Sequence, residues 1–357
     1  MNTSFYPLEL KSDMADAARR WEAFWQAELL DRPLLWLTCP MENYHFKPAS
    51  TYHERNLGDL DDILDRALHN LHGTVFGAES LPTFWTSFGT DELGVYCGAK
   101  FVFGDDAKTD TVWCDHPVDD WESWLPLKIE RNNPTYLRMQ EFYKKAEKKL
   151  GGKALLFNCD CHGNMDLLAS MRGAQRLCED LYDQPEFIDR AVQDACAVFK
   201  EAWTTLARLA RSDKYGYFQN CFSPTPCHEL ASDFSALMGP EMFKRWVLPC
   251  LELESEVVGR ASYHWDGPDA IKHADMLFGI ERIKIFYFVP SPGEKHIQHL
   301  DLHKRIQDAG KSTIVSADFE EAKLLHKELD PARTAYAIGV KNQNEIEDVI
   351  GWFRKNT

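Results

Sequence analysis

The sequence has no run of eighteen apolar residues, so no membrane span is expected. Its start also lacks a basic segment followed by an apolar core, and we therefore expect no secretory signal. The 10 cysteines are scattered over 357 residues, without the close spacing of a small disulfide scaffold. This spacing favours reduced thiols. Together these features predict a cytoplasmic protein.

The chain also has fewer basic than acidic residues. The chain has 40 Lys and Arg against 56 Asp and Glu, which gives a formal net charge of −16. Such a chain is repelled by nucleic acid phosphates and by anionic membranes, so neither is an expected partner. An anionic substrate is not excluded, because a pocket can be locally basic. Hydrophobic residues make up 44% and allow a large buried core.

The chain contains no internal repeat, low-complexity tract or linker, which predicts one domain over residues 1–357. Residues 1–30 form an N-terminal extension in this prediction. Residues 14–30 have apolar side chains, among them Trp21 and Trp25, at the three- and four-residue spacing of an amphipathic helix. We expect these two tryptophans to pack against the rest of the domain.

Two apolar strand-like runs occur early in the chain, and from residue 130 onward further runs alternate with helix-like segments. The predicted strands cover residues 34–38, 82–86, 154–158, 215–219, a stretch ending at 264, 283–288, 312–316 and 334–338. About eight β–α units are typical of a closed (β/α)8 TIM-type barrel, an α/β fold. An open doubly wound sheet is the alternative, but no Gly-rich nucleotide fingerprint follows an early strand.

The segment at residues 263–268 is the most informative. His264 and Asp266 end a predicted strand and point to the same side, because side chains alternate along a strand. Active sites of α/β enzymes lie at such strand ends, and these two groups can bind a metal or handle a proton. The alternative is that Asp266 caps the next helix and that His264 belongs to the core.

Other predicted strands also end in polar residues. Asp160, Cys161 and His162 follow one strand, and Gln219, Asn220, Cys227 and Asp233 come after the next, and Tyr287 lies in a later one. In a barrel these side chains would meet at one rim. A Cys-x-Cys pair alone is a weak zinc signal, so we interpret Cys159 as a buried thiol and keep Cys161 and His162 as candidate ligands. Asp233 would equally well cap a short helix.

Four stretches resemble the uroporphyrinogen decarboxylase-like superfamily, which includes methyltransferases that serve corrinoid proteins. These stretches are residues 32–36, 163–186, 233–249 and 263–267. Residues 38–42 lack the arginines that follow the first strand of the decarboxylase itself, so the resemblance favours the methyltransferase branch. Asp266 stands where zinc methyltransferases of the superfamily have a cysteine. The chain has no Asp-x-His-x-x-Gly cobalamin motif, so any corrinoid would be carried by a separate partner protein.

The resemblance implies a TIM barrel that moves a methyl group from a small methylated donor to a corrinoid protein, and it makes a homodimer an expected assembly. The expected catalytic residues are Asp160, Asp233, His264 and Asp266. The expected substrate-binding residues are Trp85, His162, Trp265 and Tyr287. Zinc would be bound by His264 and Asp266 together with Cys227, Cys161 or Asp233. The alternatives are a metal-free decarboxylase or lyase acting on a small carboxylic acid, and a non-catalytic ligand-binding barrel.

Overall fold

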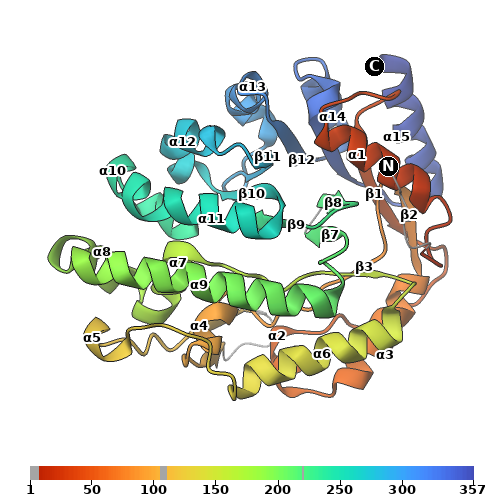
Figure 1. Cartoon of the computed structure of the whole chain (residues 1–357). Coiled ribbons are helices and arrows are strands. Elements are labelled where there is room, and N and C mark those ends of the chain that lie inside the picture. Colours follow the sequence, from red (N-terminus) through yellow and green to blue (C-terminus); the bar gives the residue numbers. More distant parts are fainter. Residues whose placement is uncertain (1–7, 105–110, 219–220) are drawn as a thin grey trace.

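The computed structural model describes residues 8–104, 111–218 and 221–357. The chain has an α/β fold around a seven-stranded sheet with the order β2-β1-β13-β12-β11-β10-β9 (Figure 1). The strands of this sheet are β1 (Leu34–Pro40), β2 (Thr74–Ala78), β9 (Cys227–Leu230), β10 (Arg260–Asp266), β11 (Ile283–Val289), β12 (Ser312–Ala317) and β13 (Thr334–Gly339). All neighbours are parallel except β1 and β2, which are antiparallel.

Three further strand pairs lie outside this ladder. They are β3 (Thr83–Phe84) with β6 (Leu155–Leu156), β4 (Phe101–Phe103) with β5 (Val112–Cys114), and β7 (Gly216–Phe218) with β8 (Cys221–Ser223). A strand therefore occupies each position at which the sequence predicts one. The ladders within the described ranges do not join into one closed ring. The α/β class and the mostly parallel sheet are confirmed, whereas a continuous eight-stranded ring is not observed.

One core lies between strands that belong to different ladders. Its buried side chains include Leu34 of β1, Leu155 of β6, Tyr217 of β7, Phe222 of β8, Cys227 of β9, Ile285 of β11, Ile314 of β12 and Ala335 of β13. Apolar contact among side chains from so many strands means that the separate ladders face a shared interior. We call this cluster the inner core.

Helix α1 (Met14–Trp25) covers the end of the inner core at which the strands begin. Trp21 donates its indole N–H to the Glu79 carbonyl at 3.0 Å, and Trp25 donates to the Phe222 carbonyl at 2.8 Å. Both tryptophans belong to the inner core, as expected. The helix ends earlier than residue 30, because Ala27 adopts a left-handed φ of 53°.

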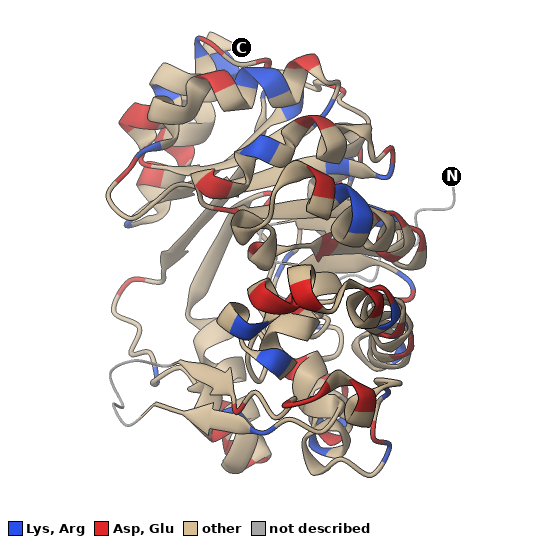
Figure 2. Ribbon diagram, turned by 90° about the vertical axis from the view of Figure 1, so that its left-hand side faces the viewer, with Lys and Arg blue, Asp and Glu red and all other residues tan. Residues whose placement is uncertain are grey.

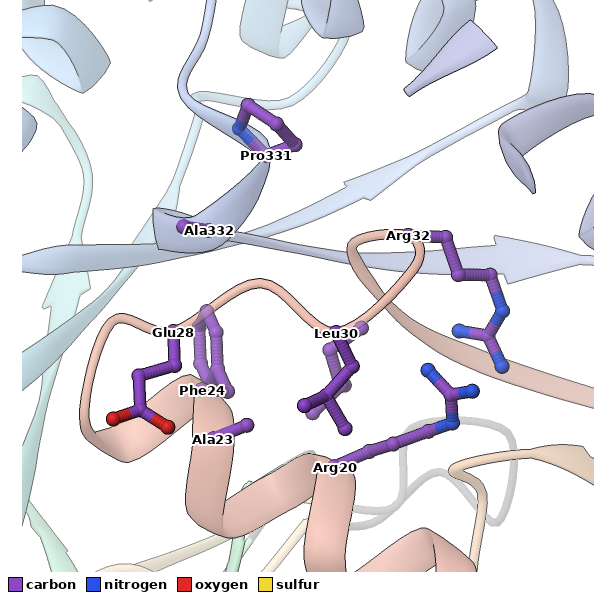
Figure 3. A pocket seen from close by; sticks show the side chains of 9 residues that line it. Arg20, Ala23, Phe24, Glu28, Leu30, Arg32, Pro331 and Ala332 are labelled. Carbon is purple, nitrogen blue, oxygen red and sulfur yellow. The ribbon is translucent and has the colours of Figure 1, made fainter. Parts of the chain in front are cut away.

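A small pocket lies beside α1 at the same end of the molecule (Figure 3). Its lining includes Arg20 and Phe24 from α1 and Leu34, the first residue of β1. Ala332, which precedes β13, completes the wall. The pocket is therefore at the amino-terminal ends of the strands, opposite the ends at which the predicted site residues lie.

Helices form the outer layer around the strands, as Figure 1 shows. The helices after α1 are α2 (Tyr52–Leu57), α3 (Leu60–His72), α4 (Glu92–Tyr96), α5 (Trp121–Trp124), α6 (Pro134–Leu150), α7 (Asn164–Arg172), α8 (Ala174–Asp183), α9 (Pro185–Ala210), α10 (Pro240–Met242), α11 (Leu248–Val258), α12 (Ala274–Gly279), α13 (Leu300–Asp308), α14 (Phe319–His326) and α15 (Gln343–Asn356). A short 3-10 helix, η1 (Asp233–Leu237), follows β9. Acidic and basic residues are interspersed over this layer, whereas the strands carry few of either (Figure 2). Across the ranges that are described, no helix combines the length and the apolar character needed to cross a bilayer.

Candidate active site

The segment after β6 provides a histidine held between two carboxylates. His162 Nε2 lies 3.0 Å from Asp160 Oδ1, and His162 Nδ1 lies 3.5 Å from Asp166 Oδ2. Asp166 lies in the first turn of α7, whose N-cap Gly163 directly follows His162. Burial is the largest single effect and lowers the pKa of His162, but the charge and hydrogen bond of Asp160, together with the hydrogen bond to Asp166, raise it well above its ordinary value.

Asp166 also holds the start of η1. Its two carboxylate oxygens accept the backbone N–H groups of Asp233 at 2.9 Å and Phe234 at 2.8 Å. This places the Asp233 carboxylate beside those of Asp166 and Asp160. Partial removal from water, followed by the charge of Asp166, raises the pKa of Asp233 to about 7, although much of the residue stays accessible to solvent. One ligand atom each from His162, Asp166 and Asp233 lies within 4.8 Å of the other two.

Strand β10 brings a second histidine to the same rim. His264 Nδ1 lies 3.7 Å from Glu229 Oε1, and the Ser262 hydroxyl donates to Glu229 Oε2 at 3.4 Å. These contacts follow from the register of β9 and β10, in which Ser262 pairs with Glu229. Burial, and then the positive charge of His162, lowers the pKa of His264. Burial, and then the charge of Asp160, raises the pKa of Glu229 well above its ordinary value.

Several buried polar atoms around these residues have no hydrogen-bond partner within the described ranges. They are Asn158 Nδ2, His228 Nδ1, His228 Nε2, Glu229 Oε1, Ser232 Oγ and His264 Nδ1. Buried polar groups in native proteins are normally paired, so unpaired atoms gathered in one place require an explanation. Asn158 and Ser232 follow β6 and β9, and His264 lies near the end of β10, which is where an α/β enzyme binds its ligand, whereas His228 and Glu229 lie within β9.

The charges at this site are mostly negative. Among the causes that dominate the pKa values of Asp160, His162, Glu229, Asp233 and His264, the neighbouring charges are carboxylates and imidazoles, and none is a lysine or an arginine. A cation would therefore be attracted more readily than a substrate carboxylate. His162 is already engaged by two carboxylates.

The structure brings together most of the residues that the sequence singles out. Asp266 acts electrostatically on both Asp233 and His264, and Asp160 acts on the same two groups. Tyr287 pairs with His264 in the ladder between β10 and β11, and their ring centroids are 5.7 Å apart. Residues far apart in the chain, from β6, η1, β10 and β11, thus form one group.

Two of the predicted metal ligands, Cys227 and Cys161, do not lie where they could bind one metal ion together with His264 and Asp266. Cys227 pairs with Arg260, four residues before His264, and this corresponds to about 13 Å along the strand. It is 3% exposed and belongs to the inner core, so the predicted ligand set of His264, Asp266 and Cys227 is wrong. Cys161 is 5% exposed, lies in the hydrophobic core and contacts Cys159, with 2.9 Å between the sulfur atoms.

Trp265 does not line the site. Side-chain alternation turns it to the face opposite His264, where it is 1% exposed and packs against Phe278 and Phe286. The prediction that Trp265 binds substrate is therefore wrong. Trp85 remains accessible, at 42% exposure, and stacks on Phe157 with ring centroids 6.1 Å apart.

Sequence reasoning missed Asp166, His228 and Glu229. The short separation of His162 and Asp166 in sequence was a usable signal, because it keeps the two side chains near the start of α7. No role was predicted from the sequence for His228 and Glu229, which lie in β9. Glu229 is brought to His264 by the pairing of β9 with β10. Gln219 and Asn220, which were also expected near this rim, lie outside the described residues.

Comparisons with known proteins bear on the fold. No family model matches the chain, and no curated protein matches it. A solved structure of a methyltransferase from Methanosarcina mazei is similar, with a TM-score of 0.58 and 12% sequence identity. The match covers 95% of this chain and 98% of that one. The chain therefore shares its fold, over nearly its whole length, with a methyltransferase.

Proposed function

We propose that the chain is an enzyme that transfers a methyl group from a small methylated donor. The fold shared with a methyltransferase supports this reaction class. The observation that carries the proposal is the group of unpaired buried polar atoms around the Asp160–His162 pair. Unpaired polar groups at the ends of parallel strands are what a ligand-binding site offers when its ligand is absent.

A closed (β/α)8 arrangement is part of this proposal. Strands occupy all the predicted positions, and the inner core joins side chains from ladders that are otherwise separate. In such a barrel the donor would bind at the carboxyl ends of the strands, beside β6, β9 and β10. Helix α1 would cover the opposite end of the barrel.

Methyl transfer breaks the bond between the methyl carbon and a heteroatom of the donor. The bonding electrons stay on the heteroatom, and a nucleophilic acceptor forms the new bond to carbon. Negative charge that develops on the heteroatom must be stabilised, and this is most effective when the stabilising group acts only in the transition state. In this proposal the leaving heteroatom lies next to the group formed by His162, Asp166 and Asp233.

The acceptor in this proposal is a corrinoid bound to a separate protein. The resemblance of residues 263–267 and of the other three stretches to corrinoid-linked methyltransferases supports it. An acceptor protein would approach the rim formed by His264 and Asp266, because Asp266 is exposed there.

A decarboxylase acting on a small carboxylic acid is less well supported. The charges that act on the site are mainly carboxylates, and its strongest positive group, His162, is already held by two of them. Binding an organic acid would add a further negative charge without a basic partner, which is unfavourable in a partly buried site.

The test uses the purified full chain, a corrinoid protein in its reduced state, and a panel of methyl ethers, thioethers and methylamines. The expected result is a change in the corrinoid absorption spectrum together with the demethylated product of one donor class. Asp160→Asn and His264→Ala should each lower the rate at least about tenfold, the scale typical of a lost catalytic contact. Asp308→Asn, which changes an exposed carboxylate at the end of α13, serves as the matched control.

Absence of product from every donor would contradict the proposal, provided that circular dichroism shows folded protein. Release of carbon dioxide from a small carboxylic acid would instead support the decarboxylase alternative. Ligand binding that is abolished by Asp160→Asn, without turnover of any donor, would indicate a non-catalytic barrel.

A further inference from the structure

We propose that His162, Asp166 and Asp233 bind one divalent metal ion of the zinc type, with Asp160 orienting the imidazole. This inference rests on the site of the proposed function and names the group that would stabilise the leaving heteroatom. The ligand set differs from the one expected from the sequence, since it uses neither His264 nor Asp266.

The spacing of the three ligands fits a metal. All three ligand atoms lie within 4.8 Å of one another, and His162 Nδ1 is 3.5 Å from Asp166 Oδ2. Two ligands bound at 2.0–2.1 Å in a tetrahedral zinc site are about 3.4 Å apart, which is close to this separation.

The surroundings of His162 are those of a metal-binding histidine. Asp160 Oδ1 lies 3.0 Å from Nε2 and can accept its N–H, so a metal ion would bind at Nδ1, on the side of Asp166, and would displace the proton that Nδ1 otherwise carries. A carboxylate behind the imidazole fixes the tautomer and the ring orientation in many metal sites. Asp166 is held by two backbone N–H groups and keeps further lone pairs on its oxygens for a metal.

Unpaired buried groups near His162 and Asp233 supply a second, independent observation. His228 is 1% exposed, and neither ring nitrogen has a hydrogen-bond partner in the described part of the chain. It lies within electrostatic reach of Asp160 and His162. The Ser232 hydroxyl, 2% exposed and adjacent in sequence to Asp233, is also unpaired. Such groups can pair with a water molecule or a donor heteroatom in the open fourth position of a metal.

Charge balance favours the same conclusion. A carboxylate oxygen of Asp166 and one of Asp233 lie within 4.8 Å of each other, and a divalent cation between them would offset the repulsion of two like charges. The two carboxylates would neutralise the charge of the ion, and the ion would replace the proton on Nδ1 of His162. When bound, a metal at this position would act as a Lewis acid toward the heteroatom of the donor.

The experiment measures metal binding without any methyl donor or corrinoid. The full chain is freed of metal with a chelator and titrated with Zn²⁺ by calorimetry, and Co²⁺ is added separately to record the absorption bands of tetrahedral coordination. We expect one equivalent of metal per chain. Asp233→Asn and His162→Gln should each weaken zinc binding at least about tenfold, because each removes a ligand.

Asp266→Asn is the matched control, because Asp266 lies on the same rim but outside the proposed ligand set. We expect its zinc affinity to stay within about threefold of the wild type, a change of under about 1 kcal/mol. Asp166 is not substituted, because it also holds the backbone of η1. Circular dichroism of each variant shows whether the chain is folded.

Two results would overturn the inference. One is the absence of stoichiometric Zn²⁺ and Co²⁺ binding by the wild type. The other is binding that survives Asp233→Asn but is lost in Asp266→Asn. The proposed function fails separately, if metal binds as described and no donor is demethylated.

Discussion

The substitution Glu92→Gln tests how one buried carboxylate affects the stability of the folded chain at different pH values. Glu92 is 0% exposed in α4, where its carboxylate accepts the backbone N–H of Phe88 and the Tyr96 hydroxyl at 3.2 Å. Burial raises the pKa of Glu92 to about 8, the Phe88 N–H opposes this rise, and the charge of Asp160 adds to it. The folded chain therefore holds this proton far more tightly than the unfolded chain does.

The sign of the effect follows from linkage. The folded pKa of Glu92, about 8, lies above the unfolded value of 4.5, so its stabilising contribution is complete below pH 4.5 and is lost as the pH rises through about 8. At about 1.4 kcal/mol per pH unit over this window, the wild type should lose about 4 kcal/mol of unfolding free energy from this group between pH 5 and pH 9. Glutamine has nearly the same shape as glutamic acid, but its side chain does not titrate in this pH range.

The assay is urea unfolding of wild type and Glu92→Gln at pH 5 and at pH 9. Near pH 5 the two proteins should differ by no more than about 1 kcal/mol, because the glutamine carbonyl can still accept the Phe88 N–H. At pH 9 the variant should be the more stable protein by several kcal/mol. Glu347→Gln, at an exposed position of α15, should follow the wild type at both values. Equal differences at pH 5 and pH 9 would refute the reasoning.

Three further predictions concern the packing around the site. Trp25→Phe removes the indole donor to the Phe222 carbonyl and should cost about 1–3 kcal/mol in urea unfolding, whereas an unchanged midpoint would mean that α1 does not hold the inner core. Trp265→Ala should cost about 3–5 kcal/mol and leave zinc affinity unchanged, since its side chain packs behind β10, and loss of zinc binding in folded variant protein would place it in the site. Burial lowers the pKa of Lys311 to about 8 from 10.5, so the unfolding free energy of the wild type relative to Lys311→Met should rise between pH 8 and pH 10.5. A constant difference over that range would show that the ammonium group is well solvated.

The inner core and the site depend on different kinds of sequence signal. Apolar runs such as Leu34–Pro40 and Ile283–Val289 could be recognised as strands because burial on both faces requires continuous apolar residues. The short strand β9 escaped recognition, because Cys227, His228 and Glu229 do not form an apolar run. Pairing with β10, a contact distant in sequence, makes these residues a strand.

The positions of the proposed metal ligands show the same limit of prediction from sequence. His162 directly precedes Gly163, the N-cap of α7, and Asp166 lies in the first turn of that helix, so their proximity is local in sequence. Their proximity to Asp233 depends on two backbone N–H bonds between segments that are 67 and 68 residues apart. No local pattern encodes such a distance.

Local chemistry by itself determined the α/β class, the positions of the strands and the common side of His264 and Asp266, because these follow from hydrophobic burial and from the two-residue repeat of a strand. The register between β9 and β10 was decided only by the tertiary structure. It brings Glu229 to His264 and leaves Cys227 at the opposite end of the strand. Register depends on the combined packing of all neighbouring strands, so it cannot be read from any one of them.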